Sequence, residues 1–166
     1  MASEAPIEIY FFPFVGGGHQ IPMIDMARVF ASHGAKATLI AAPSNALNFQ
    51  NAVVRDQLSG RPITIHSLRL PDGAPMPDPE MSAAPFTDTS ALLEPLSLLL
   101  VERPPDCIVV DAFHRWAPDV IDELGVMAMA ASLVALARIS GGSRLNRMWV
   151  RTRSPIWFRV CLIGSS

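Results

Sequence analysis

A single histidine follows a run of three glycines near the start of the chain. Segment 15–20 reads VGGGHQ, so this histidine is His19. A histidine ring has a pKa of about 6.5 in water, which suits a general base near neutral pH. A lone histidine can also be an ordinary exposed loop residue. The glycines could form a tight turn between a strand and a helix, or present backbone N–H groups to an anion or polar ligand at a helix N-terminus.

An aspartate further along the chain favours the catalytic interpretation of His19. Asp111 ends the apolar run CIVVD, and an acid in a buried strand is unfavourable unless it is paired. An aspartate that faces a histidine holds the tautomer of the ring and stabilises the imidazolium. The sequence has no G-x-S-x-G elbow, no G-x-G-x-x-G fingerprint and no G-K-[ST], which disfavours a serine hydrolase, a dinucleotide fold and a P-loop.

The remaining histidines and the cysteines offer less chemistry. His33 is expected to be a solvated residue at a helix end, and His66 a half-buried structural residue of a strand. His114 lies in the loop after Asp111 and could line a pocket or be an ordinary loop residue. Cys107 is expected to be a small buried hydrophobe. No grouping of His, Cys and Asp has the spacing of a metal site.

Apolar runs and turn signals predict the elements that position these residues. Strands are expected at 7–14, 37–42, 63–68 and 107–111, and helices from Pro22 to a Gly34 cap and at 45–58, 87–102 and 117–124. This alternation predicts an α/β fold with a Rossmann-like parallel sheet flanked by helices. Ligands bind such sheets at the carboxyl ends of the strands, near the switch in strand order. The first and fourth strands are often neighbours there, so His19 and Asp111 could meet.

The composition suits one folded domain but hides a division in charge. Half of the 166 residues are hydrophobic and 17% are charged, which excludes wholesale disorder. The formal charge of −2 gives no general attraction to nucleic acid. Residues 1–125 carry all 15 acids and seven of the 13 Lys and Arg residues, a charge of −8, whereas residues 126–166 carry six arginines and no acid. Such a change suggests two segments of different origin or function.

The termini and the apolar runs predict a cytoplasmic protein. The start MASEAPIEIYFFPF lacks the basic region and cleavage site of a secretory signal. No apolar run reaches the roughly 18 residues that a membrane span needs. The run VMAMAASLVALA at 126–137 is expected to be a buried strand or helix.

Several motifs in order resemble a known family. The segment FFPFVGGGHQIPMIDMARVFASHGAKATLI is similar to the opening of plant secondary-product UDP-glycosyltransferases, which are inverting, two-domain GT-B enzymes. The likeness continues through NFQNAVVRDQLSGRPITIHSL and PPDCIVVDAFHRWAPDVIDELG and covers roughly residues 7–125. It is most similar to the branch that glycosylates triterpenoid saponins. The resemblance implies that residues 1–125 are the incomplete, acceptor-binding N-terminal half of a GT-B fold.

The resemblance also implies roles for particular residues. His19 matches the catalytic base that deprotonates an acceptor hydroxyl, and Asp111 matches the acid that orients it. The oxygen then attacks a UDP-sugar, which is a co-substrate, and no metal or cofactor is needed. The acceptor site is implied to include the proline-rich loop 71–88. The implied acceptor-binding residues are Phe14, Phe113, His114 and Trp116, and the implied residues of the donor-proximal loop are Gly17, Gly18 and Gln20.

Residues 126–166 show no likeness to the family. The C-terminal domain that would bind the UDP-sugar is implied to be absent, so the chain alone is expected to be inactive unless that domain is supplied. A truncated gene model, a retained intron or a shifted frame would explain the basic segment, and a genuine divergent tail is the alternative. Two other hypotheses are a non-catalytic α/β module that binds a small molecule or a partner, and an unstable product without function. Scattered arginines do not favour nucleic-acid binding.

Overall fold

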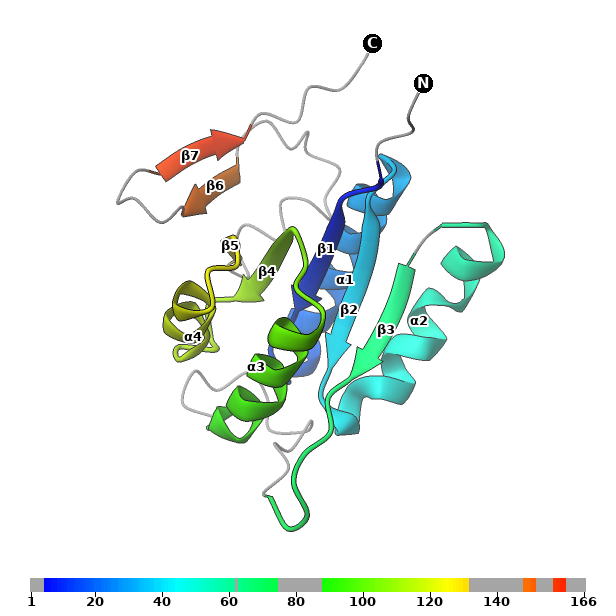
Figure 1. The fold of residues 1–166 in the computed structure, drawn as a ribbon. Helices are drawn as coiled ribbons and strands as arrows, with labels where there is room; N and C mark the ends of the chain where they lie inside the picture. The colour runs from blue at the N-terminus through cyan, green and yellow to red at the C-terminus, as the bar shows by residue number, and fades with distance from the viewer. Residues whose placement is uncertain (1–4, 62, 75–87, 132–147, 152–156, 161–166) are drawn as a thin grey trace.

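Strands and helices alternate from residue 8 to residue 131, as Figure 1 shows. The computed structural model describes residues 5–61, 63–74, 88–131, 148–151 and 157–160. The strands are β1 (Glu8–Phe12), β2 (Lys36–Ala41), β3 (Ile63–Ser67), β4 (Cys107–Asp111), β5 (Ala128–Ala131), β6 (Met148–Arg151) and β7 (Trp157–Val160). The helices are α1 (Gly17–Ser32), α2 (Ala46–Leu58), α3 (Leu93–Glu102) and α4 (Ala117–Glu123), with 3₁₀ turns η1 (Pro43–Asn45) and η2 (Ser90–Leu92).

The strands form one sheet in the order β3-β2-β1-β4-β5-β6-β7. Strands β1 to β5 are parallel, whereas β6 and β7 are antiparallel to their neighbours. The predicted parallel sheet is therefore confirmed. Strand order reverses between β1 and β4, which are directly paired from Ile9↔Cys107 to Phe12↔Val110. This pair is the switch point at which a doubly wound sheet offers a ligand crevice.

Helices cover both faces of the five parallel strands. Side chains alternate across each strand, so Phe11 and Leu39 pack with α1 and α2 while Phe12 and Ile108 pack with α3 and α4. Figure 1 shows this three-layer arrangement, with α3 in front of the sheet and α1 and α2 behind it. Full burial of such large side chains contributes about 1.5–3 kcal/mol each. Coverage on both faces explains why the strands read as continuous apolar runs.

Helix α1 begins earlier than the sequence indicates. The glycine run was expected to be a loop, with Pro22 in the first turn of the helix, but α1 starts at Gly17 and Pro22 lies one turn further in. A Cβ at Gly18 would meet open space, so the early start of the helix does not depend on a close approach at that glycine. Proline has no N–H, so the Gly18 carbonyl lacks the usual donor four residues on. The earlier start puts His19 in the first turn of the helix instead of in a loop.

The predicted helix over 87–102 is also shorter than expected. It consists of η2 and then α3, and Pro95 is the third residue of α3. Proline is tolerated there because first-turn N–H groups lack acceptors within the helix. The preceding proline-rich segment lies outside the described residues between 75 and 87.

The sheet continues past the change in charge at residue 125. Gly125 has φ of 72°, and the chain then enters β5, which pairs with β4 from Ile108↔Ala128 to Asp111↔Ala131. The run 126–137 was expected to be a buried strand or helix. Its residues 128–131 form strand β5, and residues 132–137 lie outside the described part. The division into a domain of 1–125 and a separate basic tail stays a prediction.

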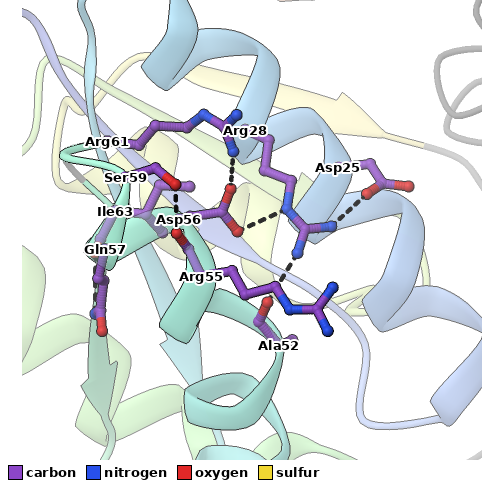
Figure 2. A network of polar contacts seen from close by, with 9 residues as sticks. All are labelled: Asp25, Arg28, Ala52, Arg55, Asp56, Gln57, Ser59, Arg61 and Ile63. Atoms are coloured by element: carbon purple, nitrogen blue, oxygen red, sulfur yellow. Dashed lines mark hydrogen bonds and ion pairs between the residues drawn. The ribbon is translucent and has the colours of Figure 1, made fainter.

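A buried aspartate joins helices α1 and α2. Asp56 is 2% exposed, accepts a hydrogen bond from Arg28 Nε at 2.8 Å and forms an ion pair with Arg61. Arg28 also binds Asp25 at 2.8 Å and the Ala52 carbonyl at 2.8 Å, as Figure 2 shows. Burial alone would raise the pKa of the Asp56 carboxyl, but the hydrogen bonds and charges of the two arginines outweigh it and lower that pKa.

Replacing Asp56 with asparagine should destabilise the fold. We expect the free energy of unfolding to fall by about 1.5–3 kcal/mol at pH 7, the usual loss for a hydrogen bond to a charged group. Because the carboxyl pKa is lowered in the folded state, its contribution is complete above about pH 4 and disappears as the pH falls through the folded-state value. Urea unfolding of wild type and Asp56→Asn at pH 7 and pH 3 measures this, with the exposed Asp122→Asn as control. A difference that persists unchanged at pH 3 would contradict the assignment.

Candidate active site

His19 and Asp111 meet at the switch point of the sheet. His19 lies in the first turn of α1, just after β1, and Asp111 is the last residue of β4. The His19 Nδ1 atom is 2.8 Å from Asp111 Oδ2, and both side chains are fully buried. The contact predicted from the strand order is therefore confirmed. A helix N-terminus favours nearby negative charge, so the carboxylate is favourably placed there.

The contacts of the carboxylate define the tautomer of His19. Asp111 Oδ1 accepts the Phe113 backbone N–H at 3.0 Å, and an ionised carboxylate can only accept. Nδ1 of His19 therefore carries the proton that Oδ2 accepts, and in the neutral ring the lone pair lies on Nε2. Nε2 is buried and has no hydrogen-bond partner among the residues that the structure describes. The arrangement leaves Nε2 as a buried proton acceptor without a partner in this part of the chain.

Aromatic rings surround the imidazole. The His19 ring centroid lies 5.4 Å from that of Phe14 and 4.5 Å from that of Phe113, and the two phenylalanines are 5.4 Å apart. Phe14 is fully buried, whereas Phe113 is half-buried. Apolar walls strengthen the electrostatic interaction of the His19–Asp111 pair because they exclude water.

Both nitrogens of His114 are used inside the protein. Nε2 is 3.0 Å from the Pro13 carbonyl and Nδ1 is 2.9 Å from Thr89 Oγ1. The ring stacks on Phe12 with centroids 4.1 Å apart. Burial lowers the pKa of His114 to about 4, so the ring is neutral at pH 7. A direct hydrogen bond between His114 and a bound acceptor substrate would require one of these two contacts to break.

Thr89 is a site residue that sequence reasoning missed. Its hydroxyl contacts His114 and accepts a hydrogen bond from Trp116 Nε1 at 3.0 Å, and its side chain is buried. A threonine just before a helix is an ordinary N-cap signal, but nothing in the local sequence points to residues 25 and 27 positions away. Trp116 is half-buried and also lies edge-on to Phe12.

The residues expected near a sugar donor have different surroundings. Gly18 is exposed, and Gly17 is the first residue of α1. Gln20 is buried and donates from Nε2 to the Val15 carbonyl at 2.8 Å. The Gln20 amide therefore braces the turn before α1. The donor-proximal role of these residues stays a prediction.

Cys107 is buried in β4, as predicted. Burial raises the pKa of its thiol to about 12, and the nearby Asp106 carboxylate acts in the same direction. We expect Cys107 to resist alkylation in the folded chain. The check is maleimide labelling at pH 8 in a Cys161→Ser background, followed by mass spectrometry. Labelling should be complete only after denaturation, and rapid labelling of the native chain would contradict the placement.

The described residues contain neither a metal cluster nor a helix that could span a membrane. No group of three or more His, Cys, Asp or Glu side chains in this part of the chain could hold a metal ion. Within the same residues, no helix has the length and apolar character that a membrane crossing requires.

The fold and the buried pair define a Rossmann-like domain with a histidine–aspartate site at its switch point. Comparison with known proteins gives the relatives. The chain is 59% identical over 120 residues to abscisate beta-glucosyltransferase of Phaseolus angularis, covering 72% of this chain and 24% of that protein. It is 36% identical over 141 residues to solanidine UDP-glucose glucosyltransferase 1 of Solanum tuberosum, covering 78% and 29%. No protein-family model matches the chain.

The solved structures that resemble this chain are also plant glycosyltransferases. A Glycyrrhiza uralensis UGT crystallised with glycyrrhetinic acid 3-O-monoglucuronide matches with a TM-score of 0.63 and 31% identity, over 76% of this chain and 28% of that one. An Arabidopsis thaliana UGT complexed with UDP-L-rhamnose matches with a TM-score of 0.57 and 22% identity, covering 76% and 36%, which supports the fold alone. The resemblance is confirmed: the chain is related to plant UDP-glycosyltransferases with the GT-B fold. It spans about a quarter of the length of the curated relatives it matches.

Proposed function

We propose that this chain supplies the acceptor-binding and proton-accepting part of a plant UDP-glycosyltransferase. The reaction would transfer a sugar from a UDP-sugar to a hydroxyl of a triterpenoid- or saponin-like metabolite in the cytoplasm. The observation that carries this proposal is the buried His19–Asp111 pair, whose Nε2 atom has no partner among the described residues. Relatives named for small-molecule glucosyltransferases support it.

In the proposed mechanism, His19 Nε2 accepts the proton of the acceptor hydroxyl. The hydroxyl oxygen attacks the anomeric carbon from the face opposite UDP, the bond from that carbon to the UDP oxygen breaks, and UDP leaves with the bonding electrons. The anomeric configuration inverts. His19 becomes an imidazolium, and the Asp111 carboxylate 2.8 Å away stabilises its positive charge. Every step uses these two side chains and the two substrates.

Aromatic side chains are proposed to hold the acceptor. Phe113 and Trp116 are half-buried residues between β4 and α4, and Phe113 lies beside His19 while Trp116 lies beside His114. Phe14 and His114 are fully buried, and they would support the acceptor site indirectly, because Phe14 packs against Phe113 and His114 packs against Trp116. Flat apolar rings suit a fused-ring acceptor, whose affinity would come mainly from burial of apolar surface.

The nucleotide-sugar is proposed to bind mainly to a region of the relatives outside the matched segment. The chain covers 24–29% of two curated relatives, and the only donor-side residues assigned to it are Gly17, Gly18 and Gln20. We therefore expect the 166-residue chain alone to give no measurable transfer. UDP-glucose with a panel of sapogenins, followed by chromatography of the products, tests this. Robust turnover that His19→Ala abolishes would contradict the proposal that the UDP-sugar binds mainly outside the matched segment.

A carboxylate acceptor is a second candidate, and the name of one relative favours it. The relative with 59% identity is named for abscisate, a carboxylate, and the panel should include it. A carboxylate is already ionised at pH 7, whereas a hydroxyl needs a base. The two acceptor classes therefore differ in how much they depend on His19.

A non-catalytic binding module is the other candidate. Calorimetry of the chain with a sapogenin, with and without UDP-glucose, separates it from the transferase part. Acceptor binding is compatible with either function, so the deciding assay is a fusion in which residues 1–131 replace the matching segment of the Phaseolus angularis relative. Transfer by the fusion supports the enzyme, and a folded, acceptor-binding but inactive fusion would support the module.

A further inference from the structure

His114 connects three segments that are far apart in sequence. Its Nε2 atom contacts the Pro13 carbonyl, 101 residues away, in the turn after β1. Its Nδ1 atom contacts the hydroxyl of Thr89, 25 residues away, just before η2. The same hydroxyl accepts the Trp116 indole N–H at 3.0 Å. His114 is fully buried, and both of its ring nitrogens contact other protein groups. It is therefore the centre of a polar network inside the protein.

The chemistry of the partners defines the protonation of the ring. A proline carbonyl can only accept, so Nε2 of His114 carries a proton. The Thr89 oxygen accepts from Trp116 and its hydroxyl hydrogen can point to His114 Nδ1, which then accepts. The ring is neutral and both nitrogens are satisfied. Burial also disfavours the protonated form, with a pKa of about 4.

This network lies beside the His19–Asp111 pair and joins the same two loops. The hydrogen bond between His19 and Asp111 links the start of α1 to the end of β4, and the bond between His114 and Pro13 links the turn after β1 to the loop after β4. The residue before His114 donates its backbone N–H to Asp111 Oδ1 at 3.0 Å. The His114 backbone N–H itself donates to the Asp111 carbonyl at 3.1 Å. A shift of His114 would therefore move the donor that orients the carboxylate.

We propose that His114 is a positioning residue: as a neutral, Nε2-protonated ring it fixes the β4–α4 loop to Pro13 and Thr89, and so holds Asp111 in the orientation that keeps a proton on His19 Nδ1. Its importance for transfer rests on the proposed function. Its effect on the His19–Asp111 hydrogen bond does not, because that bond is a property of the folded chain.

Ring NMR of the ¹⁵N-labelled full chain at pH 7 tests the proposal. In wild type we expect His19 as the Nδ1–H tautomer with a low-field Nδ1 proton, and His114 as the Nε2–H tautomer. His114→Phe keeps a ring that can stack on Phe12 but removes both hydrogen bonds. We expect this variant to lose the low-field His19 proton to exchange with water and to show a mixture of His19 tautomers. His114→Gln, which can still donate to Pro13, should recover part of the signal.

Two outcomes overturn the proposal. One is a folded His114→Phe chain whose His19 proton and tautomer match wild type. If that variant fails to fold, Thr89→Val decides, because it removes one hydroxyl at nearly constant volume. We expect faster exchange of the His19 Nδ1 proton in Thr89→Val, and an unchanged rate would overturn the proposal. The experiment needs no sugar donor, so failure here is distinct from failure of the transferase function.

Discussion

Replacing His19 with alanine should lower transfer to a hydroxyl acceptor by about 10²- to 10⁴-fold, the usual contribution of a positioned general base. The reason is geometric. Asp111 holds the proton on Nδ1, so Nε2 is the free proton acceptor at the switch point among the residues that the structure describes. Alanine removes that atom and leaves the Asp111 carboxylate buried without its side-chain partner. The assay is initial-rate transfer by the fusion of residues 1–131 to the remainder of the Phaseolus angularis relative.

The control for this prediction lies on the same helix. His33 is exposed at the end of α1, where its Nδ1 atom contacts the Val29 carbonyl at 2.8 Å. His33→Ala should leave the transfer rate within about twofold of wild type, since surface substitutions change stability by less than about 0.5 kcal/mol. Circular dichroism of both variants establishes that the fold is retained. Equal rates for His19→Ala and wild type would remove His19 from the mechanism.

Replacing Asp111 with asparagine should lower transfer by about 10⁴-fold, the upper end of the range expected for loss of His19, as in hydrolase triads where the analogous change reverses the tautomer. Phe113 N–H points at the Oδ1 position, so the amide oxygen of asparagine would accept there. The NH₂ group would then face His19 Nδ1 and donate to it. His19 would adopt the Nε2–H tautomer and lose the lone pair that accepts the proton.

The Asp111→Asn prediction has a matched control and a spectroscopic check. Asp119 is an exposed acid in the first turn of α4, and Asp119→Asn should leave transfer nearly unchanged. Ring NMR should show His19 protonated at Nε2 in Asp111→Asn. If the variant keeps the wild-type rate, the carboxylate is not needed. If it keeps the Nδ1–H tautomer, the explanation through Phe113 is wrong.

The sequence predicts the elements around the site well because local signals agree there. Segments 37–42 and 107–111 are apolar runs bounded by turn residues, and such runs form strands in a sheet covered on both faces. The meeting of His19 and Asp111 follows from one general rule about switch points. The start of α1 could not be predicted, because glycines and a following proline also describe a loop that leads into a helix.

Long-range partners account for what the sequence does not reveal. From the sequence, His114 could line a pocket or be an ordinary loop residue, because its partners, Pro13 and Thr89, are 101 and 25 positions away. The helix over 45–58 is predicted, but the burial of Asp56 is not, because its partner Arg28 lies 28 positions earlier. Such contacts can be predicted only when the sheet order and the packing of the helices are known, because a local sequence pattern carries no information about distant partners.

The most direct test of the account compares two acceptors in one variant. A sapogenin hydroxyl needs a base, whereas the abscisate carboxylate is already ionised at pH 7. We predict that His19→Ala lowers transfer by the fusion to the sapogenin by at least about 10²-fold and lowers transfer to abscisate far less. If His19→Ala lowered both rates by the same factor, His19 would act in binding or folding, and the claim that it is the base would be contradicted.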